Sequence, residues 1–166
     1  MGVTPRGKTL GIVGAGAIGS AMARRAKAFG LQLRYHGPNK KLALEQELDI
    51  EFEPTLDGLL AQSDVVSLHC PLTQQTRHCI NATSIARMKP GAFVINTGRG
   101  PLINEQDLVD ALNSGHLGGA GLDVFENEPQ IHPELLSNPH VTLTAHIGGA
   151  TPECRVAIIK QAIDNA

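Results

Sequence analysis

The chain has 166 residues, of which 42% are hydrophobic, and its formal net charge at neutral pH is −2. This length suits one globular domain with an adequate core, and the weakly negative charge argues against binding to nucleic acid or to an anionic membrane. No apolar run approaches the roughly 20 residues of a membrane-spanning helix, and the N-terminus carries no apolar secretion signal. Cys70, Cys79 and Cys154 lack paired metal-ligand spacing, so we expect reduced thiols in a cytoplasmic protein without a metal site.

A glycine-rich turn between a predicted strand and a predicted helix is the feature around which the chain is organised. Leu10, Ile12 and Val13 form a short apolar run, as in a buried parallel strand. Residues 14–19 follow with the sequence GAGAIG, and residues 21–29 have a helical pattern. This order suits the pyrophosphate of a dinucleotide, because a helix N-terminus offers free N–H groups and a positive dipole end.

Each glycine of this turn has an expected role in binding the cofactor. Gly14 permits the tight turn, Gly16 lets the phosphates approach the backbone, and Gly19 lets the helix pack closely on the strand. Ala17 and Ile18 lie within the same predicted phosphate-binding turn. The alternative is a glycine-rich turn that binds no ligand.

The end of the second predicted strand, residues 31–36, bears on the choice between NAD and NADP. In NAD-binding folds an Asp or Glu commonly ends this strand and bonds the adenosine ribose. Here residues 36–41 read HGPNKK, so no carboxylate would repel a 2′-phosphate and two cations are close by. This favours NADP, with His36 and Lys40 as candidate contacts. The alternative is that Lys40 and Lys41 are merely solvated on the first turn of the next helix.

Strands and helices alternate along the rest of the chain. We predict further strands at 50–53 (a short edge strand), 64–69, 92–96, 118–124 and 141–144, and helices at 42–48, 56–61, 81–88, 104–113 and 151–163. Segment 125–139 holds three prolines and is expected to be a loop. The alternation predicts an α/β, Rossmann-type, doubly wound parallel sheet in three layers, with residues 1–166 forming one dinucleotide-binding domain.

Loops at the carboxyl ends of parallel strands line the ligand crevice of such a sheet. Segment 70–76 follows the strand at 64–69, so Cys70, Pro71 and Thr76 are candidate contacts in a wall of the cofactor site. His69 and His78 have no nearby partner in sequence, and we expect them to be structural.

Residues able to do chemistry follow three of the later strands. These are Arg99, the acidic pair Glu126 and Glu128, and His146. An Arg can hold a carboxylate by two hydrogen bonds, and a His can transfer a proton at neutral pH. From spacing alone, Arg99 could equally bind the cofactor phosphates or cap a helix, the Glu residues could be loop charges, and His146 could be a hydrogen-bonded loop histidine.

The motifs together resemble a known family. They are GKTLGIVGAGAIG, DVVSLHCPLTQQT, MKPGAFVINTGRG, GLDVFENEP and AHIGGAT. The sequence resembles the nucleotide-binding domain of the D-isomer-specific 2-hydroxyacid dehydrogenases, especially the glyoxylate/hydroxypyruvate reductase branch. The resemblance runs along nearly the whole chain. It implies reduction of glyoxylate, hydroxypyruvate or a similar 2-keto acid with NADH or NADPH.

The resemblance also implies roles for individual residues. Arg99 would be a catalytic arginine, His146 the acid/base, and Glu128 rather than Glu126 its carboxylate partner. Asp123 matches the residue that contacts the nicotinamide carboxamide, and its alternative is an aspartate that satisfies local backbone. Further cofactor contacts are expected at the strand ends, at Thr97, Arg99, His146 and Gly148.

The sequence departs from the family pattern in three respects. Ala145 stands where the family usually has proline before the catalytic histidine, and the second strand lacks the aspartate typical of NAD users. Family members also have a second domain that supplies part of the substrate site and closes the cleft. We therefore expect an excised or naturally truncated cofactor domain that binds a nicotinamide dinucleotide and turns over poorly or not at all alone.

Two further expectations come from the resemblance. Some relatives are NAD(H)-responsive corepressors, so a non-enzymatic interaction module is the alternative function. The family commonly dimerises through this domain, so a homodimer is expected.

Overall fold

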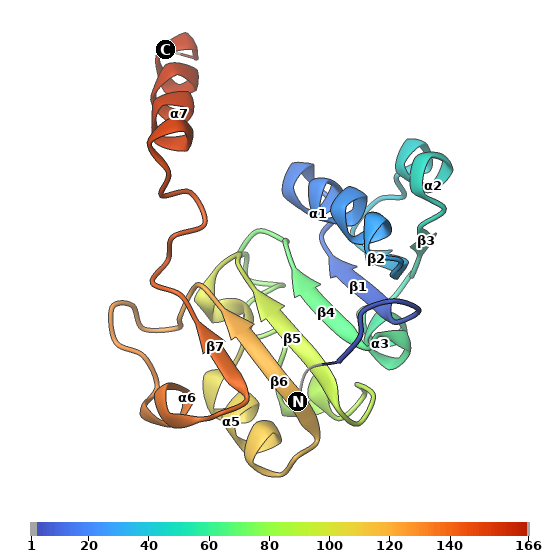
Figure 1. The fold of residues 1–166 in the computed structure, drawn as a ribbon, viewed down its shortest axis with the longest axis vertical. Coiled ribbons are helices and arrows are strands. Elements are labelled where there is room, and N and C mark those ends of the chain that lie inside the picture. The colour runs from blue at the N-terminus through green and yellow to red at the C-terminus, as the bar shows by residue number, and fades with distance from the viewer. Residues whose placement is uncertain (1–2, 166) are drawn as a thin grey trace.

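Strand β1 lies in the interior of the sheet, and the chain winds outward from it on both sides. The computed structural model describes residues 3–165. In it, seven parallel strands form one sheet in the order β3-β2-β1-β4-β5-β6-β7 (Figure 1). The strand order reverses between β1 and β4, and this reversal is the place where doubly wound sheets bind their ligands.

The elements alternate along the chain as follows. The strands are β1 (Thr9–Val13), β2 (Gln32–His36), β3 (Glu51–Phe52), β4 (Val65–Leu68), β5 (Ala92–Asn96), β6 (Leu117–Leu122) and β7 (Val141–Leu143). The helices are α1 (Ala17–Ala28), α2 (Leu42–Leu48), α3 (Leu56–Gln62), α4 (Ala82–Ile85), α5 (Glu105–Asn113), α6 (Pro133–Ser137) and α7 (Pro152–Asp164), with a 3₁₀ turn at Gly100–Leu102.

Helices cover both faces of the sheet. All five residues of β1 are buried, as expected of a strand covered on both sides. A Cβ atom at Gly11 would meet Leu59 of α3, whereas the Ile12 side chain lies against Gly19 of α1. Successive residues of a strand point to opposite faces, so α3 and α1 pack on opposite sides of the sheet.

The buried side chains form two clusters, divided near the switch between β1 and β4. One cluster holds apolar residues of β1, β2, α1 and α2, such as Leu10, Leu33 and Leu44, while Val13 at the end of β1 belongs to the other. The other holds those of β4, β5, β6, α3 and α5, such as Val66 and Leu108. The open carboxyl ends of β1 and β4 therefore lie at the boundary between two cores.

The structure confirms the predicted parallel α/β sheet and corrects three details. The helix predicted at 81–88 is confined to residues 82–85, and residues 86–88 form turns and a bend. Helix α1 begins at Ala17 rather than at residue 21, because Gly16 in an extended conformation is already its N-cap. The segment 125–139 was expected to be loop, and that is wrong for residues 133–137, which form α6. Pro133 has the fixed φ of a first helical residue, and the His132 side chain accepts a hydrogen bond from the Glu134 amide.

Helix α7 stands apart from the sheet (Figure 1). None of its residues is buried, and its apolar side chains Val156, Ile158, Ile159 and Ile163 are exposed. Within residues 3–165, no helix has the length and apolar character that crossing a bilayer requires.

Candidate functional site

The glycine turn after β1 has the geometry of a phosphate-binding turn. Gly14 has a φ of +95°, and a Cβ there would lie 2.6 Å from the Cys70 backbone nitrogen. A Cβ at Gly19 would lie 2.1 Å from the Gly14 carbonyl oxygen, so this glycine permits close packing of α1. Gly16 has nothing within 4 Å of its Cβ position and faces open space. No side chain caps α1, which leaves its first N–H groups available to an anion.

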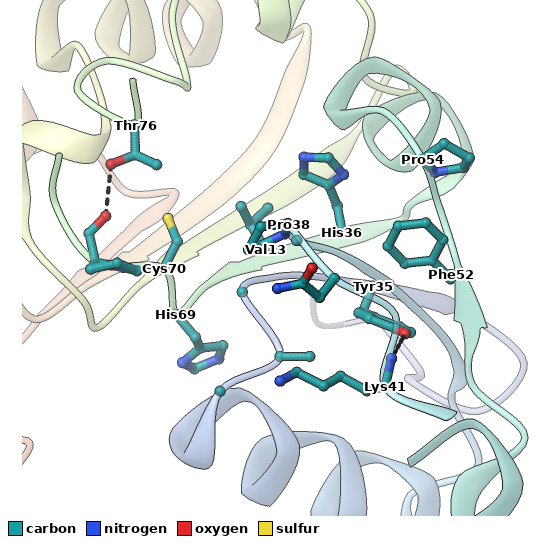
Figure 2. Close-up of a pocket in the computed structure, with 16 residues that line it drawn as sticks. Val13, Tyr35, His36, Pro38, Lys41, Phe52, Pro54, His69, Cys70 and Thr76 are labelled. Carbon is teal, nitrogen blue, oxygen red and sulfur yellow. Dashed lines mark hydrogen bonds between the residues drawn. The ribbon is translucent and has the colours of Figure 1, made fainter. Parts of the chain in front are cut away.

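A cleft of about 640 Å³ opens beside this turn. Its walls are the glycine turn, the end of β2 with the loop that follows, and the segment after β4 (Figure 2). Of the predicted cofactor residues, Gly14, Gly16, His36, Cys70, Pro71 and Thr76 line it. The size and the mixture of apolar and polar groups suit the adenosine part of a dinucleotide.

The two lysines after β2 lie in different places. Lys41 lines the cleft, and in Figure 2 its side chain runs toward the start of α1. The Lys40 ammonium lies 5.5 Å from the centre of the Phe52 ring, a cation–π geometry. Helix α2 begins at Leu42, so both lysines precede it rather than belonging to its first turn. The residue expected to contact the cofactor, Lys40, is therefore held on Phe52, and Lys41 borders the cleft.

His36 lines the cleft, and Glu53, next to it, fixes its ring. His36 Nδ1 lies 3.0 Å from the Glu53 carbonyl oxygen, which can only accept, so Nδ1 carries the proton. The Glu53 carboxylate is held by Arg34 and by Gln62. The Glu53 carboxylate is thus already paired.

The segment after β4 is a self-bonded turn. The Thr76 hydroxyl donates to the Pro71 carbonyl at 2.7 Å and accepts the Thr73 amide at 2.8 Å. His69, expected to be structural, borders the cleft, with Nε2 2.9 Å from the Ser67 hydroxyl. Burial lowers the pKa of His69, which favours a neutral imidazole there.

A second cavity of about 630 Å³ adjoins the first, since His69, Cys70 and Pro71 line both. Ile18, Thr97 and Arg99 border this second cavity. One extended ligand can therefore pass from the β2 end of the cleft to the arginine.

Asn96 shapes the Arg99 loop and was not singled out from the sequence. It is 1% exposed. Its side chain accepts the Gly98 amide at 3.0 Å and donates to the Arg99 carbonyl at 2.9 Å. An amide that ends a buried apolar strand must find hydrogen-bond partners, and this is the signal that could have identified it.

Glu128 and His146 form an ion-pair geometry at the ends of β6 and β7. His146 Nδ1 lies 2.8 Å from Glu128 Oε2, and both side chains are partly exposed. The bond to His146 lowers the pKa of Glu128, and the Phe125 amide, which donates to the same carboxylate, adds to the effect. A carboxylate can only accept, so Nδ1 carries a proton and Nε2 is left to face a ligand.

Asp123 fixes the backbone on either side of His146. Its carboxylate accepts hydrogen bonds from the Thr144 hydroxyl and from the amides of Ile147 and Gly148, at 2.5–2.9 Å. His146 has a φ of +53° within this turn. Asp123 thus satisfies local backbone amides, which is the alternative role given for it from the sequence. Its contact with the nicotinamide carboxamide stays a prediction.

Glu126, the other acid of the predicted pair, faces away from His146. Its carboxylate lies 2.5 Å from His78 Nε2 and 3.8 Å from Arg77, and it accepts the Glu105 amide at 3.3 Å. The Glu126 amide donates to the Glu105 carboxylate at 2.7 Å. Glu126 therefore fastens the loop that carries Glu128 to α5 and to the segment after β4, and His78 has a structural partner.

Comparison with known proteins gives a consistent set of relatives. The family model described as "D-isomer specific 2-hydroxyacid dehydrogenase, NAD binding domain" matches residues 1–148. A glyoxylate reductase of Thermococcus onnurineus is 49% identical over 91% of this chain and 45% of its own length. A 4-methyl-2-oxopentanoate reductase of Aspergillus oryzae is 48% identical over 92% of this chain and 46% of its own.

Solved structures agree with these sequence relatives. A glyoxylate reductase from Paecilomyes thermophila has a TM-score of 0.94 and 47% identity, covering 99% of this chain and 50% of that one. The apo D-mandelate dehydrogenase of Rhodotorula graminis has a TM-score of 0.89 and 44% identity, covering 92% and 45%.

The chain thus spans about half the length of the relatives it matches. Those relatives are named as reductases and dehydrogenases, which gives no support to the corepressor alternative. With most of its residues matching the family model, the chain belongs to the D-isomer-specific 2-hydroxyacid dehydrogenases and contains their NAD-binding domain.

Proposed function

We propose that this chain is the cofactor-binding half of an NAD(P)H-dependent reductase of small 2-keto acids, with glyoxylate or hydroxypyruvate as substrate. The observation that carries the proposal is the Glu128–His146 pair, 2.8 Å apart. It lies at the ends of β6 and β7, beside the strand whose end carries Arg99. The names of the relatives, glyoxylate reductase among them, support the substrate class.

When bound, NAD(P)H would supply the hydride for the carbonyl carbon of the keto acid. His146 donates the Nε2 proton to the carbonyl oxygen, so the 2-hydroxy acid forms with its charge balanced. Glu128 fixes the orientation of the imidazole through its bond to Nδ1. Arg99, on the loop shaped by Asn96, holds the substrate carboxylate.

Some of the expected cofactor contacts line the two adjoining cavities, and others lie on neighbouring turns and loops. Gly14, Gly16 and the start of α1, with Ala17, Ile18 and Gly19, would hold the pyrophosphate. Thr97 borders the second cavity, and Asp123 and Gly148 follow β6 and β7; these residues would contact the nicotinamide end of the cofactor.

We propose NADP rather than NAD as the preferred cofactor. Lys41 borders the β2 end of the cleft, and Lys40 lies next to it on Phe52. The Glu53 carboxylate nearby is paired with Arg34. Among the described residues that line the cleft there is a lysine, Lys41, and no carboxylate, which would favour a 2′-phosphate at this end.

The first test is titration of the purified chain with NADPH and NADH, followed by nicotinamide fluorescence. Glyoxylate is then added to the same samples and the nicotinamide absorbance is recorded. We expect binding of NADPH with slow or no oxidation, because this chain spans about half the length of the reductases it matches. Rapid oxidation would mean that this chain forms a working substrate site by itself. Binding of neither nucleotide would contradict the proposal.

We further propose that the chain forms a homodimer. The exposed apolar side chains of α7, which include Val156 and Ile159, support this, since a second copy could cover them.

A further inference from the structure

We propose that the buried hydroxyl of Tyr35 positions the loop of residues 37–41 and thereby sets the discrimination between NADPH and NADH. Tyr35 would be a positioning residue, acting through Lys41 rather than by contact with the 2′-phosphate. The inference rests on the proposed preference for NADP.

The Tyr35 hydroxyl links the loop to α2. It accepts the Lys41 backbone N–H at 2.5 Å and donates to Glu45 Oε1 at 2.7 Å (Figure 2 shows the Lys41 bond). Tyr35 itself is 0% exposed. Burial and the neighbouring Glu45 carboxylate raise the pKa of Tyr35, so the phenol keeps the proton that it donates.

The loop has little else to hold it. Across residues 3–165, residues 37–40 make no hydrogen bond of their own to the rest of the chain. Lys41 is the N-cap of α2, and no side chain caps that helix. The Lys41 carbonyl accepts the first backbone bonds of α2, and the bond from the Lys41 amide to Tyr35 ties this end of the loop to β2.

The Tyr35 ring also contributes to the position of the second cation, Lys40. Its ring packs against Phe52, with the ring centres 5.2 Å apart and the planes inclined by 58°. Phe52 in turn carries the Lys40 ammonium at 5.5 Å. Both lysines near the β2 end of the cleft are thus placed by contacts that lead back to Tyr35: one through its hydroxyl and one through its ring.

Tyr35→Phe separates these two supports. It keeps the ring on Phe52 and removes the hydroxyl, and with it the hydrogen bonds to Lys41 and Glu45. The Lys41 backbone is then no longer fixed by this bond, and its cation, at the border of the cleft, loses the position from which it would face the 2′-phosphate that NADPH carries and NADH lacks. We expect the NADPH dissociation constant to rise about tenfold, or about 1.4 kcal/mol. We expect the NADH dissociation constant to change less than about twofold, or about 0.4 kcal/mol.

A matched control breaks a different polar link to α2. Arg24 of α1 holds the exposed Glu47 carboxylate with two hydrogen bonds of 2.6 and 2.7 Å, away from the loop. Arg24→Gln should leave both affinities unchanged. Lys41→Ala, which removes the cation itself, should weaken NADPH at least as much as Tyr35→Phe.

The measurement is the fluorescence titration of each variant with NADPH and with NADH, alongside its thermal midpoint. A selective loss of NADPH affinity in Tyr35→Phe supports the inference. An unchanged preference, or equal weakening of both nucleotides, overturns it while the proposed function stands. A wild-type chain that binds NADPH no better than NADH overturns the cofactor preference itself, and the inference with it.

Discussion

The glycines of the phosphate turn differ in what a side chain would meet at each. At Gly19 a methyl group would lie 2.1 Å from the Gly14 carbonyl oxygen, whereas at Gly16 it would enter open space. The φ of Gly16 is −78°, which alanine adopts without strain. Gly19 is therefore required for the packing of α1, and Gly16 leaves room for the ligand.

Two alanine substitutions separate these roles. Gly19→Ala gains helix propensity but overpacks α1 on the turn, and we expect a loss of about 1–3 kcal/mol and a Tm lower by roughly 2–10 °C. Gly16→Ala should keep its Tm and weaken NADPH by about tenfold or more, since a Cβ would stand where the phosphates approach. Thermal melts and fluorescence titrations check both. A stable Gly19→Ala protein would contradict the packing argument.

The pairing of Glu128 with His146 can be tested without turnover. The pKa of Glu128 is lowered first by its bond to His146. His146→Asn removes the imidazole, and Asn tolerates the φ of +53° at this position. We expect the pKa of Glu128 to rise toward its ordinary value of about 4.3, measured by carboxyl ¹³C shifts against pH. His140→Gln, at an exposed histidine, is the control and should leave the pKa of Glu128 unchanged.

The sign of this shift fixes its effect on stability. A carboxyl group with a depressed pKa in the folded state stabilises that state above its ordinary pKa. The contribution of Glu128 is lost as the pH falls through the lowered value, so the pair persists into mildly acidic solution.

At the scale of elements, two hydrogen bonds join the N-terminus of α5 to the loop after β6. The Glu105 amide donates to the Glu126 carboxylate, and the Glu126 amide donates to the Glu105 carboxylate. Glu105, the first residue of α5, is 6% exposed, and burial raises its pKa. A raised carboxyl pKa means that the folded state binds more protons than the unfolded state between the two values. Stability is therefore lost as the pH rises through this window.

Glu105→Gln tests this exchange. Glutamine keeps an oxygen for the Glu126 amide and carries no charge. We expect a higher Tm than that of the wild-type chain at pH 7, by about 2–4 °C for each kcal/mol. The gain should vanish near pH 4, where the wild-type carboxyl is protonated in both states. A gain that is the same at both pH values would rule out burial of the charge as its cause.

The sequence predicted the elements whose pattern is local. Buried strands such as 92–96 and the turn at 14–19 were recognisable because apolar runs and glycine spacing reflect nearby backbone geometry. Helix α6 was missed because five residues that begin with proline, inside a proline-rich segment, carry no helical periodicity.

The site was less predictable where a contact joins distant segments. Glu128 could be chosen over Glu126 only through the family resemblance, because their spacing in the chain is compatible with either facing His146. The bond between His78 and Glu126 spans 48 residues and leaves no mark in the local sequence. Likewise, the positions of Lys40 and Lys41 depend on Phe52 and Tyr35, which lie on neighbouring strands.

At the scale of the whole molecule, α7 allows a test of assembly. Its apolar side chains are exposed, and Ile159 is among them at 59%. If they pack against a second copy, the chain of 17.6 kDa should sediment at about twice that mass. Ile159→Glu should then shift the population toward the monomer. A wild-type chain that remains monomeric over the accessible concentrations would exclude the proposed homodimer.

The two apolar cores described for the fold have a consequence for dynamics. Each is a candidate cooperative unit that can open separately, and the cleft for the dinucleotide lies across the boundary between them. A ligand that bridges both units binds only when they are docked, so it penalises partial opening as well as global unfolding. Amide hydrogens of β1 and β4, paired across this boundary, are then expected to exchange more slowly in the presence of the cofactor, even where they make no contact with it.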